Sequence, residues 1–266
     1  MRSFIVVQHS YTEFLGTIEK QLEHREIGFD YSRPFIGDAL PGSPMDYDAL
    51  ICLGGPMPPT ATDEYPWLEN EVELIQAFNR AERPVIGFGL GGLLMAKAAG
   101  GRVSGDVPLH GAFVTAHAVE KAGGEEGEEA GQDPVARAVD GQTVLVWHAG
   151  NAELPEGVEA TVVDDDGRWL AFRAGPKAYA MRFRPEIKPG IIEDMVMEGQ
   201  EVPDNVGDIL RRCQELWAQG AMQAVTDGVL VALVSELGLM REQARKRPVF
   251  ALTPGPGPEE NEGGSS

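Results

Sequence analysis

The sequence has few cysteines and no recognisable export signal. Among its 266 residues only Cys52 and Cys213 are cysteines, which excludes the disulfide framework of a small secreted domain. No charged and apolar leader of the secretory type precedes the first apolar segment. We therefore expect the protein to act in a reducing, cytoplasmic environment.

The sequence is also poor in positive charge. Lys and Arg total 22 against 42 Asp and Glu, which gives a formal net charge of −20. Nucleic-acid phosphates and anionic lipid headgroups attract basic surfaces, so neither is an expected partner. The most apolar segment, residues 221–240, is interrupted by Asp227 and Glu236, whereas a membrane span needs about 20 mostly apolar residues. Neutral or basic partners fit this charge better.

What remains is the composition of an ordinary globular protein, with 42% hydrophobic and 24% charged residues. The apolar runs at residues 3–7 and 48–53 are typical of strands buried on both faces of a parallel sheet, and residues 27–33 can return as a further strand in the pattern of a βαβ unit. Apolar residues with helical spacing at 14–22 and 67–78 predict the helices between them. The pattern indicates an α/β fold with a mostly parallel sheet.

Residues 83–95 predict a strand that turns sharply into a helix. A turn of this kind, the nucleophile elbow, normally presents a Ser or Cys in a strained backbone conformation. Here its central residue is Gly89. The elbow therefore lacks a nucleophile.

Many further motifs follow one another in order along the first three-quarters of the chain. They lie at residues 53–57, 63–68, 84–87, 90–91, 100–103, 147–148, 154–155, 171–173 and 179–180. Together they resemble the class I glutamine amidotransferase family and are similar to the glutaminase domain of GMP synthase. The resemblance implies a three-layer, flavodoxin-like fold with helices on both faces of the sheet, followed by C-terminal helices.

The family resemblance also implies a Cys-His-Glu triad, in which the cysteine attacks the side-chain amide of glutamine. At the three matching positions this sequence has Gly89, Arg184 and Glu186. It also departs from typical family glutamines at Leu93, Leu170 and Arg182. The glutaminase centre is therefore expected to be degenerate.

Two groups of residues are candidates for binding a ligand. In the family, backbone N–H groups of the loop containing Gly54 and Gly55 help to form the oxyanion hole, and Leu90 follows the elbow. Arg182 and Arg184 are two apart on a predicted strand, so we expect both guanidinium groups to face the elbow.

The two arginines allow two interpretations. They could bind a small anion or carboxylate at the helix N-terminus behind Gly89, or they could pair with Glu186 and fill the old pocket. Neither interpretation is favoured by the sequence.

Three further residues or motifs have a functional and a structural interpretation. His148 could be catalytic, but it shows no orienting partner and a structural role is favoured. Cys52 could be a displaced nucleophile, but its apolar strand predicts a buried thiol. Gly87, Gly89 and Gly92 match G-x-G-x-x-G, which is typical of dinucleotide binding, although the surrounding motifs favour the amidotransferase interpretation.

We expect three parts in the chain. Residues 1–190 form the amidotransferase-like core, in which residues 118–141 form a mobile acidic and glycine-rich loop. Residues 191–247 form a helical extension packed on the core. Residues 248–266, rich in Pro, Gly, Glu and Ser, form a disordered tail.

The C-terminal helices are expected at residues 191–198, 204–218 and 221–240, with Asp204 as an N-cap. The last helix is apolar around more than one full turn at residues 229–234. A helix that covers one face normally keeps a polar reverse side. We expect its surplus apolar surface to join a homodimer or a partner protein, with complete burial in the chain's own core as the alternative.

The sequence thus predicts a glutamine amidotransferase-like pseudoenzyme that acts as a binding, regulatory or scaffold subunit. The alternatives are an active amidotransferase or hydrolase on glutamine or γ-glutamyl-type substrates, or a nucleotide-binding enzyme that uses the glycine-rich elbow. No cofactor is expected. No metal site is expected either, because the glutamates of residues 121–131 lack the spacing of a calcium loop.

Overall fold

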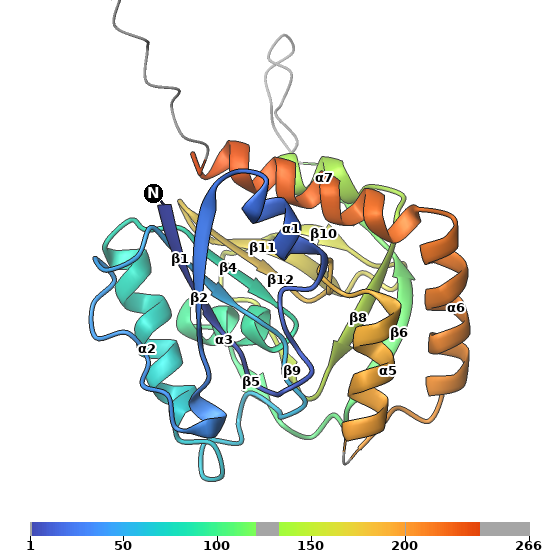
Figure 1. Cartoon of the computed structure of the whole chain (residues 1–266), viewed down its shortest axis with the longest axis horizontal. Helices are drawn as coiled ribbons and strands as arrows, with labels where there is room; N and C mark the ends of the chain where they lie inside the picture. The colour runs from blue at the N-terminus through green and yellow to red at the C-terminus, as the bar shows by residue number, and fades with distance from the viewer. Residues whose placement is uncertain (1, 121–132, 200, 240–266) are drawn as a thin grey trace, which may run out of the picture.

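The computed structural model describes residues 2–120, 133–199 and 201–239. Its centre is an eight-stranded sheet, in which the strands from β2 to β12 run parallel and the last three pair antiparallel (Figure 1). In spatial order the strands are β2 (Ile27–Ser32), β1 (Arg2–Val7), β3 (Ala49–Cys52), β4 (Val85–Phe88), β12 (Ala178–Met181), β11 (Trp169–Gly175), β10 (Ala160–Val163) and β7 (His117–Ala118). The predicted α/β fold with a mostly parallel sheet is confirmed.

Two antiparallel pairs lie outside this sheet. They are β6 (His110–Thr115) with β8 (Thr143–His148), and β5 (Val103–Ser104) with β9 (Asn151–Ala152). An isolated bridge between Val146 and Phe183 joins β8 to the segment that follows β12. This bridge brings β8 beside the loop that carries the arginines predicted to form a site.

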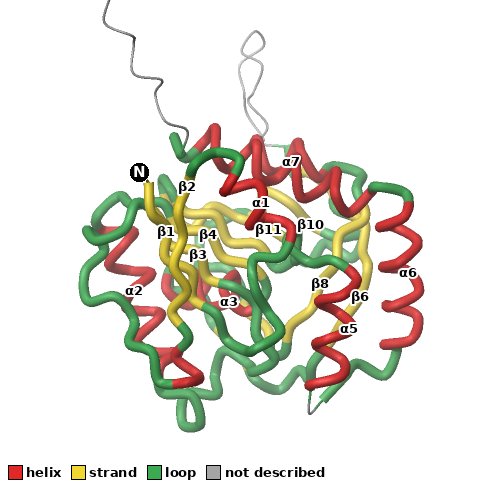
Figure 2. The backbone as a smooth tube through the Cα atoms, in the orientation of Figure 1, coloured by secondary structure: helices red, strands yellow, loops and turns green. Residues whose placement is uncertain are grey.

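Helices cover both faces of the large sheet, as predicted (Figures 1 and 2). One face is covered by α1 (Thr17–Glu23), α4 (Pro134–Val139) and α7 (Ala221–Glu236). The opposite face is covered by α2 (Trp67–Arg80) and α3 (Leu90–Ala98). A third cluster joins α5 (Pro189–Glu198) and α6 (Val206–Ala218) to β8, while the short 3-10 helix η1 (Pro34–Ile36) follows β2.

The alternation of side chains along β1 shows why its whole run is apolar. Phe4 and Val6 pack into the cluster under α1, α4 and α7, whereas Ile5 and Val7 pack into the cluster under α2 and α3. Successive residues of a strand point to opposite faces. Because helices cover both faces, both sets of side chains must be apolar.

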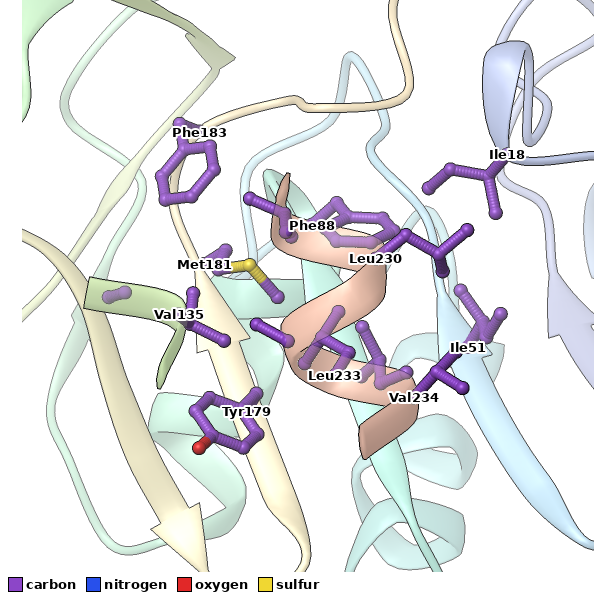
Figure 3. Packing of buried hydrophobic residues seen from close by; sticks show 14 of the residues in the cluster. Ile18, Ile51, Phe88, Val135, Tyr179, Met181, Phe183, Leu230, Leu233 and Val234 are labelled. Atoms are coloured by element: carbon purple, nitrogen blue, oxygen red, sulfur yellow. The ribbon is translucent and has the colours of Figure 1, made fainter. Parts of the chain in front are cut away.

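The structure assigns α7 to the chain's own core. Leu230, Leu233 and Val234 lie among the residues that cover the sheet, close to Phe88 and Ile51 (Figure 3). Val231, in contrast, is 56% exposed. Of the two alternatives for the surplus apolar surface, α7 thus follows burial in the chain's own core, because α1 and α4 pack against the sides of α7 that the sheet leaves free. The homodimer prediction loses the feature on which it was based.

The predicted loop at residues 118–141 is also partly wrong. It contains α4, which begins after Asp133, whose carboxylate accepts hydrogen bonds from the N–H groups of Val135 and Ala136. An Asp at this position stabilises a helix start. Residues 121–132, which include most of the predicted acidic loop, and the predicted tail at 248–266 lie outside the described residues.

The predicted cap of α6 is displaced by one residue. The N-cap is Asn205 rather than Asp204, and its side chain makes no capping bond. The Asn205 amide donates instead to the carbonyl oxygen of Gly111, at 3.2 Å. This contact ties α6 to β6.

Within the described residues, no helix is both long and apolar enough to span a bilayer.

We expect Leu233→Ala to lower the free energy of unfolding by about 2–5 kcal/mol, because it leaves a cavity in the main core. Urea unfolding followed by circular dichroism measures this loss. The matched control is Val231→Ala on the exposed side of the same helix, which should change stability by less than about 0.5 kcal/mol. Equal effects of the two variants would show that α7 does not pack as described.

Candidate functional site

The loops that follow β1, β3, β4 and β12 meet at one edge of the sheet, because these four strands are parallel. In open α/β sheets, ligand sites form outside the carboxyl ends of the strands. This edge therefore holds the candidate site.

Gly89 lies between β4 and α3 with a φ of 53° and a ψ of −116°. Positive φ is strained for a residue with a Cβ atom, so the chain has the predicted elbow conformation at this position. Gly54 and Gly55 lie beside the elbow: a Cβ atom on Gly89 would lie 3.4 Å from the Gly54 Cα atom, and one on Gly55 would lie 2.7 Å from Leu90 Cδ2. The structure thus brings together the four residues of the predicted elbow and oxyanion loop.

The glycines of α3 allow the helix to lie close to the sheet. A Cβ atom on Gly91 would overlap the carbonyl oxygen of Cys52 in β3, and one on Gly92 would overlap that of Met181 at the end of β12. The N–H of Gly91 already donates to Leu53. These glycines therefore serve helix and strand packing.

Arg184 fills the space in front of the elbow. Its side chain is fully buried, and a Cβ atom on Gly54 would overlap its guanidinium group, while one on Gly89 would lie 2.8 Å from its Cδ atom. Nε donates to Glu186 Oε1 at 2.5 Å, and Nη1 donates to Glu13 Oε1 at 2.8 Å. Of the two interpretations of the arginines, Arg184 follows the one in which it pairs with carboxylates and fills the pocket.

The three side chains form a buried ion cluster, which we name the Arg184 cluster. Burial lowers the pKa of Arg184, but Glu186 and Glu13 outweigh that effect and raise it. Burial raises the pKa of Glu186, while Arg184 opposes the rise. Ser10 Oγ donates to Glu13 Oε2 at 2.9 Å. Each charge of the cluster thus contacts an opposite charge, as buried charges require, although Arg184 Nη2 and Glu186 Oε2 have no hydrogen-bond partner among the described residues.

Glu13 was not predicted from the sequence, nor was a second buried pair, His9 with Glu71. The His9 ring donates from Nδ1 to the carbonyl oxygen of Gly54 at 2.7 Å and from Nε2 to Glu71 Oε2 at 2.8 Å. In the imidazolium form both ring nitrogens donate, which matches a carbonyl oxygen and a carboxylate as partners. The sequence signal that could have indicated His9 and Glu13 is their position just after the buried strand β1.

Burial alone lowers the pKa of His9, but Glu71 and the Gly54 carbonyl outweigh it, and the pKa is raised. His9 also stacks on Trp67 at a centroid distance of 5.5 Å. When His9 is protonated, the His9–Glu71 pair therefore holds the Gly54 loop against α2.

Cys52 is buried in β3, as the apolar strand predicted. Burial and the neighbouring Glu71 carboxylate raise the pKa of its thiol well above the ordinary value. A thiol that stays protonated is a poor nucleophile. The geometry gives no support to Cys52 as a displaced nucleophile.

Arg182 does not share the partners of Arg184. Its Nη2 atom donates to Asn151 Oδ1, and its guanidinium carbon lies 4.6 Å from the centroid of the Trp169 ring. The expected pairing of both arginines in one site at the elbow is therefore wrong. Beyond the end of β12 at Met181, the Arg182 side chain lies over Trp169 of β11, whereas the Arg184 side chain reaches Glu13 and Glu186.

His148 lies near Arg182 and not in the Arg184 cluster. Its Nδ1 donates to the carbonyl oxygen of Gly150 at 3.1 Å, and its ring centroid lies 6.0 Å from that of His110. Burial, followed by the charges of Arg182 and His110, lowers the pKa of His148 to about 3. Such an imidazole is neutral at pH 7 and a weak base, which favours the structural interpretation.

We expect Glu71→Gln to destabilise the protein more at low pH than at high pH. The raised pKa of His9 means that its pairing stabilises the fold fully below the unfolded-state pKa of about 6.5, and that this contribution is lost as pH rises through the folded-state value. Urea unfolding between pH 5.5 and 9 measures the difference from the unaltered protein. The control is Glu69→Gln on an exposed position of α2, for which the difference should stay constant over this range.

Comparison with known proteins supports the fold and the family. The family profile described as "Glutamine amidotransferase class-I" matches residues 7–200. YfeJ of Salmonella typhimurium, named as a glutamine amidotransferase-like protein, is 37% identical over 106 residues, which are 39% of this chain and 44% of that protein. The aligned part of this chain thus spans less than half of that relative.

Solved structures agree with the fold. A glutamine amidotransferase from Thermotoga maritima has a TM-score of 0.72 at 20% identity, over 89% of this chain and 98% of that one. One from Methylobacillus flagellatus has a TM-score of 0.72 at 22% identity, over 89% and 96% of the two chains. With the family profile matching well over half of its length, the chain belongs to the class I glutamine amidotransferase family.

Proposed function

We propose that this chain is a pseudoenzyme of the class I glutamine amidotransferase family that acts as a binding, regulatory or scaffold subunit. The observation that carries this proposal is the position of Arg184. Its guanidinium group, held by Glu13 and Glu186, occupies the space in front of Gly89 and Gly54. A glutamine side chain would need that space to reach the elbow.

The chemistry of the cluster points the same way. Hydrolysis of glutamine through a thioester needs a nucleophile and a base that accepts its proton. Gly89 has no side chain, and the guanidinium of Arg184 stays protonated and offers only donors. Glu186, which matches the glutamate of the family triad, is hydrogen-bonded to Arg184. The elbow therefore holds neither group.

The neighbouring groups are poor substitutes. His9 donates from both ring nitrogens and has no lone pair to accept a proton. The thiol of Cys52 is buried and has a raised pKa. His148, with a pKa of about 3, lies with Arg182 outside the cluster. An active hydrolase that uses displaced groups is therefore the weaker proposal.

The proposed mode of action is binding of another protein. The formal net charge of −20 favours a neutral or basic partner surface, because association is faster between complementary charges. The same charge disfavours nucleic acid and anionic membranes. We place this activity in the cytoplasm on the basis of the low cysteine content.

We expect the purified protein to release no ammonia from glutamine above background, with or without cell extract that could supply a partner. Loss of a nucleophile normally lowers the rate by several orders of magnitude. The matched set is the unaltered protein, Gly89→Cys, Arg184→His and the double variant. Activity should appear only in the double variant, which restores both groups. Hydrolysis by the unaltered protein that survives Cys52→Ala would contradict the proposal.

Gly89→Cys should also lower stability. The new Cβ atom must adopt a positive φ and would lie 2.8 Å from Arg184 Cδ, so both strain and overlap result. Circular dichroism and urea unfolding of each variant show whether lost activity reflects lost folding.

A further inference from the structure

Arg182 is a buried cation without a carboxylate partner. The residue is 6% exposed, its Nη2 atom bonds the neutral amide of Asn151, and its Nε atom has no hydrogen-bond partner. Within residues 2–120, 133–199 and 201–239, it takes part in no ion pair with a carboxylate. A buried charge normally requires an opposite charge, because loss of hydration is otherwise uncompensated.

Among the described residues, two imidazole rings, and no carboxylate, lie beside Arg182 on the side of β8. His148 is 4% exposed, and its Nε2 atom has no partner. His110 lies beside it, at a centroid distance of 6.0 Å, and is only half-buried. Arg182 and His148 bond the adjacent residues Asn151 and Gly150, so their side chains lie close together. Burial, together with the charge of Arg182, lowers the pKa of both histidines.

The nearest acidic groups are already paired. Asp164 accepts from Arg168 Nε at 2.7 Å and from the backbone N–H groups of Asp166 and Arg168. Asp166 binds the same guanidinium at 2.7 Å. Asp164 still raises the pKa of Arg182 in part, but burial and Arg168 outweigh it and lower the value to about 10. The site around Arg182 therefore lacks negative charge.

We propose that Arg182, His148 and His110 form a binding site for a small oxyanion, such as a phosphate or carboxylate group. The oxyanion would accept from Arg182 Nε–H and from the protonated His148 Nε2–H, two of the buried atoms that have no hydrogen-bond partner in the described part of the chain. It would enter from the side of His110, which is partly exposed. Charge-assisted bonds of this kind are the stronger hydrogen bonds in proteins.

Other occupants explain less. A water molecule could satisfy both hydrogen bonds, but it would leave the guanidinium charge uncompensated. A metal ion could bind a neutral histidine nitrogen, but Arg182 offers only donors and would repel it. The proposed site lies apart from the Arg184 cluster and does not depend on whether the chain hydrolyses glutamine.

The site should bind more tightly as pH falls. Without an anion, the charges facing His148 are Arg182 and His110, and burial with these charges keeps its pKa near 3. An anion at Nε2 raises that pKa, so binding takes up a proton and affinity grows toward acidic pH. Burial raises the pKa of the outer carboxylate, Asp164, but its hydrogen bonds with Arg168 outweigh that effect and lower it, so Asp164 stays charged between pH 6 and 8.

The test is isothermal titration of the full chain with sulfate, phosphate, acetate and malonate at constant ionic strength, at pH 6 and pH 8. Sulfate keeps its charge across this range, so any change in its affinity reports the protein. We expect one saturable site with several-fold tighter sulfate binding at pH 6. Arg182→Gln should weaken binding by about tenfold or more, as expected for loss of a bond to a charged group. If phosphate binds more tightly than the other three anions, the ligand is a phosphate group. If malonate binds most tightly, the ligand is a carboxylate.

The control is Arg102→Gln, an exposed arginine paired with Glu153, which should bind like the unaltered protein. His110→Asn, at a half-buried position, provides a second test if Arg182→Gln does not fold, and it should weaken binding several-fold. Absence of saturable binding by all four anions would overturn the proposal. So would affinities that are unchanged in both variants.

Discussion

The guanidinium group of Arg184 lies between two buried carboxylates, and this contact joins loops that are distant in the sequence. Glu13 follows β1, Glu186 follows β12, and Arg184 packs over Gly54 and Gly89. Three charged groups can be buried together only if each is paired. The carboxyl edge of the sheet is therefore held closed by the residues that fill it.

The elbow keeps its conformation although its nucleophile is absent. Gly91 and Gly92 allow α3 to lie against β3 and the end of β12, and α3 is buried throughout most of its length. His9 and Glu71 fix the Gly54 loop on the opposite side. These contacts serve packing rather than catalysis, which explains how the fold of an amidotransferase persists around a filled pocket.

The fold and the elbow could be predicted because their signals are local: apolar runs, helical spacing and a glycine at a sharp turn. The ion pairs could not be predicted, because Glu13 meets Arg184 across 171 residues and no pattern links them. Strand alternation did not predict that Arg182 and Arg184, beyond the end of β12, have different partners. The apolar surface of α7 was correctly seen, but its cover, α4, lies within a segment whose composition predicted a loop.

The most direct test of the Arg184 cluster is the free energy of unfolding of Arg184→Met, measured with urea beside the exposed control Arg102→Met. Removing the guanidinium leaves two buried carboxylates without a cation, so the account predicts a loss of about 3–5 kcal/mol and almost no change for the control. A similar loss should follow Glu186→Leu, whereas replacing Arg184, Glu186 and Glu13 together by apolar residues should recover much of it. An Arg184→Met variant as stable as the unaltered protein would contradict the central role of this cluster.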